Sequence, residues 1–73
     1  MKAVEAIVEA RKHEAEGPMS SSAVLCRERA EALARKGEER LALAQAARSL
    51  AYSLGVFHPT TKQVASAAGL VRA

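Results

Sequence analysis

The sequence predicts an all-α protein, and three observations carry this prediction. Hydrophobic residues make up 49% of the 73 residues, and alanine, which has the highest helix propensity, is the commonest of them. Aromatic residues are only Tyr52 and Phe57, whereas a sheet is usually rich in aromatic and β-branched residues. Apolar residues also recur at helical spacing between short turns. We therefore expect about four helices in a single small domain, residues 1–73, with successive helices antiparallel.

The first expected helix covers residues 1–16. Its apolar stripe contains Val4, Ile7 and Val8 at helical spacing, with Ala3, Ala6 and Ala10 beside it. Gly17 and Pro18 end this helix, because glycine accepts the left-handed conformation and the proline ring cannot continue the turn.

A helix hairpin is expected over residues 19–54. One of the serines at positions 20–22 caps its first helix, which runs to about Lys36. The apolar side of this helix carries Val24, Cys26, Ala30, Leu33 and Ala34. Its solvent side carries Arg27, Arg29, Glu31 and Arg35, and the last two are spaced for an i,i+4 ion pair. Gly37 is the expected left-handed residue at its end.

The second helix of the hairpin is expected from about Glu38 to Leu54. Its apolar stripe comprises Leu43, Ala46, Ala47, Leu50 and Leu54. Gly55 closes the helix, and Pro59 favours an extended link before it. A short C-terminal helix over residues 60–70 follows, capped by Thr60 or Thr61. Its apolar positions include Val64 and Leu70, and Val71 follows them.

Charge is divided unevenly along the chain. The formal net charge is +3, and all eight acidic residues lie at or before Glu39. The densest basic group comprises Arg27, Arg29, Arg35, Lys36 and Arg40. Glutamates are interleaved with these cations, so we expect a solvated, salt-bridged face rather than a phosphate-binding track.

Composition also bears on compartment and partners. Cys26 is alone, which excludes an internal disulfide and fits a reducing compartment. No apolar run approaches the roughly 20 residues that cross a bilayer. We therefore expect a cytoplasmic or nuclear protein without membrane contact. A chain of this length hides only about 60% of its unfolded surface, so its core is thin and a partner or second copy is expected.

No group of residues predicts catalysis, a cofactor site or a metal site. Cys26 has no positioned base, and we expect it to behave as a small hydrophobe. His13 is expected in solvent and His58 in a turn, and these residues lack zinc-site spacing. Tyr52 and Phe57 are expected to fill the core near the turn. We expect no enzyme activity and no small-molecule substrate.

Three motifs in the second half of the chain share the spacing of a known family. They are Ala30-Glu31-Ala32-Leu33-Ala34-Arg35-Lys36-Gly37, then Ala42-Leu43 with Arg48-Ser49-Leu50, and then Leu54-Gly55-Val56-Phe57-His58-Pro59. With these motifs, the stretch from Ala30 to Val71 resembles the tetratricopeptide repeats (TPRs) of the kinesin light chain type. The resemblance implies antiparallel helical hairpins and a protein-binding role.

These observations predict a non-catalytic module for protein–protein interaction or self-assembly. We expect its partner-binding surface to combine apolar residues of the first and last helices with two arginines of the second. The residues are Val4, Ile7, Val8, Val64, Leu70, Val71, Arg27 and Arg35. The alternative is a small basic helical protein that binds nucleic acid, with its last two helices arranged loosely as a helix-turn-helix.

Overall fold

A computed structural model describes residues 2–17, 20–56, 59–60, 62–64 and 66. Within these ranges all regular secondary structure is helical, so the all-α prediction is confirmed. The helices are α1 (Ala3–Glu16), α2 (Ser21–Arg35) and α3 (Glu39–Ser53). Lys62, Gln63, Val64 and Ser66 are also helical. The rest of the helix expected at 60–70 lies outside the described residues, as do Leu70 and Val71.

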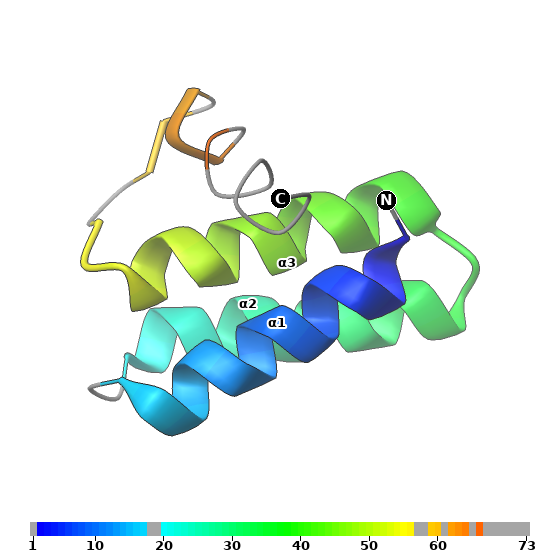
Figure 1. Ribbon diagram of the computed structural model, residues 1–73. Helices are drawn as coiled ribbons and strands as arrows, with labels where there is room; N and C mark the ends of the chain where they lie inside the picture. The colour runs from blue at the N-terminus through cyan, green and yellow to red at the C-terminus, as the bar shows by residue number, and fades with distance from the viewer. Residues whose placement is uncertain (1, 18–19, 57–58, 61, 65, 67–73) are drawn as a thin grey trace.

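The three helices form antiparallel hairpins in chain order (Figure 1). α1 runs opposite to α2, and α2 runs opposite to α3, so α1 and α3 are parallel. All three pairs are in contact, and the α2–α3 contact is the most extensive. The start of α1 lies beside the start of α3, where the backbone N–H of Ala3 donates a hydrogen bond to the Glu39 carboxylate. Among the described helices, none is both long enough and apolar enough to cross a membrane.

The ends of α2 and α3 follow from their glycines. Gly37 and Gly55 have φ of 80° and 90°, the left-handed conformation that was predicted for both. After α2, the N–H of Gly37 donates to Ala34 O (3.1 Å) and that of Glu38 to Leu33 O (3.0 Å). Gly55 and Val56 make the same pair of bonds after α3. Both helices therefore end in Schellman motifs, which supply partners for the last carbonyl groups.

The helix starts are capped by side chains where the sequence offers hydroxyl groups. Ser20 precedes α2 in an extended conformation, and its Oγ accepts a hydrogen bond from the N–H of Ala23 at 3.2 Å. Thr60 and Gln63 form a capping box: Thr60 Oγ1 accepts from the Gln63 N–H (3.2 Å), and Gln63 Oε1 accepts from the Thr60 N–H (2.8 Å).

The prediction for Gly17 is wrong. Its φ of −109° and ψ of 178° are extended, not left-handed. The reason lies in the next residue, because a proline pushes the preceding residue away from helical angles toward extended ones. The N–H of Gly17 still donates to His13 O at 2.9 Å, so α1 keeps its last bond.

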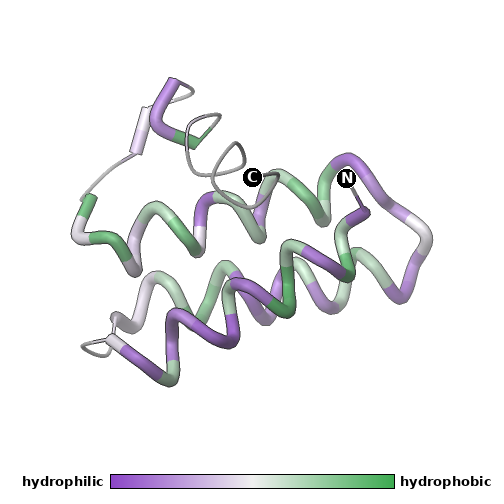
Figure 2. Tube along the Cα trace, in the orientation of Figure 1, coloured by the Kyte–Doolittle hydropathy of each residue, from purple (hydrophilic) through white to green (hydrophobic). Residues whose placement is uncertain are grey.

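The core consists mainly of alanine. Among the described residues, nine of the twelve buried hydrophobic ones are alanines, and the others are Ile7, Cys26 and Leu50. Ala6, Ile7, Ala30 and Ala46 form one cluster between the three helices, and Ala10, Leu50 and Ala51 form another between α1 and α3. Figure 2 shows moderately hydrophobic residues along all three helices, with hydrophilic residues gathered at the α2–α3 turn and interspersed along α1.

The predicted stripe of α1 is partly wrong. Ile7 is buried, but Val4 and Val8 are 60% and 57% exposed, and Ala3, Ala6 and Ala10 are buried instead. Large side chains at these three alanine positions would hold α1 away from the other helices, whereas methyl groups let the backbones approach closely. Leu54, just after α3, is likewise half exposed, while the polar Ser49 within α3 is fully buried.

Salt bridges join the outer surfaces of α1 and α2. Arg27 forms a bidentate pair with Glu14, with both N–O distances 3.0 Å. Its remaining terminal nitrogen donates to Glu31 at 2.8 Å, and Arg11 donates to the same Glu31 oxygen at 2.8 Å. Glu31 therefore bonds to Arg27 and Arg11, and the predicted Glu31–Arg35 pair does not form.

Candidate functional site

A groove of about 300 Å³ between α2 and α3 is a concave site lined by both polar and apolar side chains. One face of α2 supplies Ser22, Leu25, Cys26 and Arg29. One face of α3 supplies Gln45, Arg48 and Tyr52. Both sets follow helical spacing, so each helix presents a continuous line of side chains to the groove.

A hydrogen bond between the two helices fixes their register along the groove. The Oγ of the buried Ser49 donates to the carbonyl oxygen of Ala23 at 2.7 Å. In an antiparallel pair with this register, Ser22 and Tyr52 lie at one end of the groove. Arg29 and Gln45 lie at the other end, and Cys26 and Arg48 lie between them.

Two arginines of the groove have no carboxylate partner in the part of the chain that the structure describes. Among those residues, no carboxylate forms a salt bridge with Arg29 or Arg48. Arg27, on the other side of α2, is by contrast bonded to two glutamates. The groove is therefore a site of positive potential.

Cys26 forms part of the groove wall and is 5% exposed. Burial raises the pKa of its thiol, and the charges of Arg48 and then Arg29 partly oppose this rise. The thiol is thus neutral near pH 7, which agrees with the expectation of a small hydrophobe.

Gln45 has an unmet hydrogen-bonding group. Its side-chain oxygen is buried and accepts no hydrogen bond from any described residue. A buried acceptor without a donor costs about 1–3 kcal/mol.

The described lining of the groove is rich in hydrogen-bond donors. Arginine donates hydrogen bonds but cannot act as a base at neutral pH, and no histidine or carboxylate lines the groove. The described residues contain no cluster of histidine, cysteine and acidic side chains that could hold a metal ion. His13, which was expected in solvent, is half-buried at the end of α1, and His58 lies outside the described residues.

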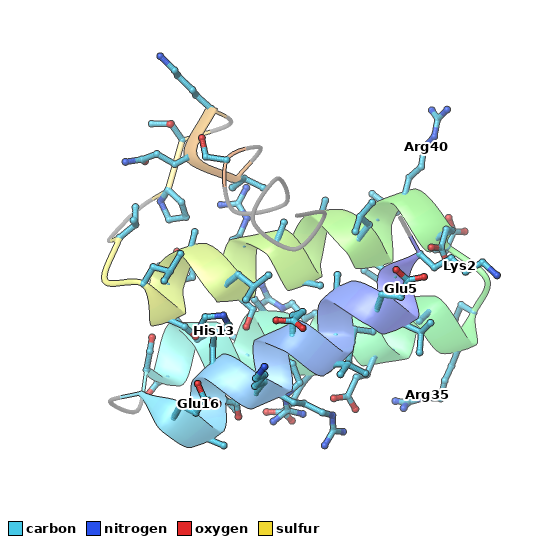
Figure 3. All side chains as sticks on the ribbon, in the orientation of Figure 1. Lys2, Glu5, His13, Glu16, Arg35 and Arg40 are labelled. Atoms are coloured by element: carbon cyan, nitrogen blue, oxygen red, sulfur yellow. The ribbon has the colours of Figure 1, made fainter. Side chains whose placement is uncertain are left out.

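The residues predicted to bind a partner differ in exposure. Val4 and Val8 are exposed one turn apart on α1, but Ile7 lies in the core. Arg27 is occupied by its salt bridges, while Arg35 is exposed and points away from the helices in Figure 3. Val64 is half-buried, and Leu70 and Val71 lie outside the described residues. Partner binding by these residues stays a prediction, and Ile7 and Arg27 are not exposed for it in the described structure.

The groove itself was missed in the sequence. Gln45, Arg48 and Tyr52 are spaced i, i+3 and i+7, and Ser22, Cys26 and Arg29 are spaced i, i+4 and i+7. These two sets of residues at helical spacing are the sequence feature from which the groove could have been predicted. Tyr52 was expected in the core, but it is half-buried and lines the groove; Phe57 lies outside the described residues.

No protein-family model, no curated protein and no solved structure matches this chain.

Proposed function

We propose that this chain is a non-catalytic protein-interaction module that binds another polypeptide, either a different protein or a second copy of itself. The observation that supports this proposal best is the placement of the apolar side chains. The core is filled largely by alanine, whereas five large aliphatic residues are about half exposed: Val4, Val8, Leu25, Leu41 and Leu54. Exposed aliphatic side chains of this kind gain free energy when a partner covers them.

Val4 and Val8 form the most continuous part of this surface, because residues four apart lie on one face of a helix. Covering the exposed part of each valine is worth about 1 kcal/mol or more. The resemblance of Ala30–Val71 to TPRs supports the same function, since such repeats act by binding proteins. A cytoplasmic or nuclear setting remains part of this proposal.

Nucleic-acid binding is the alternative function class, and it has less support. It requires several free cations along one surface. Arg11 and Arg27 already bind glutamates of the same chain, so two of the available cations are occupied.

Light scattering during size-exclusion chromatography, across a wide concentration series, tests the proposal. We expect a dimer or larger species, or a specific partner captured by cross-linking from a cell extract. The double variant Val4→Ser, Val8→Ser should weaken this association. Ala15→Ser, at an exposed position of the same helix, is the matched control and should leave it unchanged. A protein that stays monomeric and captures nothing would refute the proposal.

A further inference from the structure

The α2–α3 groove has properties that the proposed function does not explain. A purely apolar docking surface needs no charge, yet two arginines without carboxylate partners in the described structure line this groove. Both line the same groove as Cys26, Arg29 from α2 and Arg48 from α3. The two charges therefore lie on opposite walls of one groove.

We propose that this groove binds the phosphoryl group of a phosphorylated side chain in the protein partner, with Arg29 and Arg48 as its two cationic contacts. This inference rests on the proposed function and names the chemistry of the partner. A phosphomonoester carries a charge of about −1.5 to −2 at neutral pH, which two guanidinium groups balance. Arginine suits this role because its planar donors form paired hydrogen bonds with phosphate oxygens.

The remaining groups of the groove fit a peptide that carries such a phosphate. Leu25 is 49% exposed and offers an apolar wall beside the cations. The hydroxyl groups of Ser22 and Tyr52 are further donors at one end of the groove.

The size of the groove separates this ligand from nucleic acid. A volume of about 300 Å³ is at the lower limit of ligand pockets and suits one phosphorylated side chain. Nucleic-acid binding proteins instead contact about 6–10 successive phosphates along an extended surface. We therefore assign the groove to a single phosphoryl group on a polypeptide.

Nuclear magnetic resonance titration of the full chain tests this assignment. The probes are a capped glycine-rich peptide with a central phosphoserine, the same peptide with serine or glutamate at that position, inorganic phosphate, and single-stranded DNA. We expect the phosphoserine peptide to shift the Arg29 and Arg48 side-chain signals and the amides of the groove in a saturable manner. The serine peptide should cause no shift, and the glutamate peptide should bind at least about tenfold more weakly.

Two substitutions and one control locate the site. Arg48→Gln and Arg29→Gln should each weaken phosphoserine binding about tenfold or more, as expected for the loss of a charged hydrogen bond. Arg40→Gln removes the same charge from an exposed position of α3 that points away from the helices in Figure 3, and it should change binding less than twofold. Circular dichroism establishes that the variants remain folded.

Several results would overturn the assignment. One is that Arg40→Gln weakens phosphoserine binding as much as Arg29→Gln or Arg48→Gln does. Another is that the glutamate peptide binds as tightly as the phosphoserine peptide. The others are that inorganic phosphate binds more tightly than the phosphopeptide, or that DNA binds more strongly at the groove than the phosphopeptide does. If phosphopeptide binding fails while the light-scattering experiment shows association that depends on Val4 and Val8, this inference falls and the proposed function stands. If neither phosphopeptide binding nor association is observed, both this inference and the proposed function are rejected.

Discussion

Replacing Leu50 by alanine tests the core assignment most directly. Leu50 is 2% exposed and packs against Ala10, Ala51 and Val56. A buried Leu→Ala change costs about 2–5 kcal/mol, with larger losses where neighbours cannot fill the space. Two of these neighbours are alanines, whose methyl groups cannot extend into a void, so we expect about 3–5 kcal/mol. A chain of this length has a total unfolding free energy of about 4–11 kcal/mol, so the loss is a large part of it.

Urea unfolding followed by circular dichroism measures this effect. With a denaturant dependence of about 1 kcal/mol per molar, the midpoint should fall by about 3 M or more. Leu41→Ala is the matched control, because it makes the same change in the same helix at a residue that is 56% exposed. A surface change of this kind should cost no more than about 0.5 kcal/mol.

Equal losses for Leu50→Ala and Leu41→Ala would refute the assignment of the buried face of α3. The measurement belongs at low protein concentration, because association through exposed leucines would make the Leu41→Ala result depend on concentration.

Two further predictions concern the polar contacts between helices. The hydrogen bond from Arg27 lowers the pKa of Glu14 below its ordinary value of 4.5. Burial tends to raise the pKa of Glu31, but Arg27 and Arg11 outweigh it and lower that pKa too. The stability from these pairs is therefore complete above about pH 4.5 and is lost as pH falls through the lowered values. Arg27→Met should cost about 1–2 kcal/mol at pH 7 in urea unfolding, and the difference from wild type should shrink below pH 4.5; a constant difference would contradict this. Ser49→Ala should cost about 1 kcal/mol through the lost hydrogen bond, whereas Ser53→Ala, on the same helix, should cost less than half of that in the same assay.

The positions of the helices could be predicted from the sequence because their ends depend on local chemistry. Gly37 and Gly55 adopt the left-handed conformation, and Ser20 and Thr60 are the capping residues, as their places in the chain indicate. Each of these features needs only a few neighbouring residues. Gly17 was the exception, because Pro18 overrode the usual ending.

The buried faces could not be predicted as well. Alanine occurs on several sides of each helix, so helical spacing alone does not show which side is inside. Val4 and Val8 are the more hydrophobic choice on α1, but close helix packing favours Ala3, Ala6 and Ala10. The groove was missed for a related reason, since Arg29, Gln45 and Arg48 are ordinary surface residues until α2 and α3 come together.

The alanine face of α1 does not by itself fix the position of this helix along α2 and α3, and polar contacts at its two ends do. Apart from Ile7, the buried residues of this face are alanines, so few side chains oppose a slide of α1 by one turn, about 5.4 Å, along α2 and α3. Ile7 is the large side chain of α1 that packs into the described core. Here the bond from Ala3 to Glu39 holds one end of α1, and the Glu14–Arg27 pair holds the other. These two contacts set the register of α1 along α2 and α3.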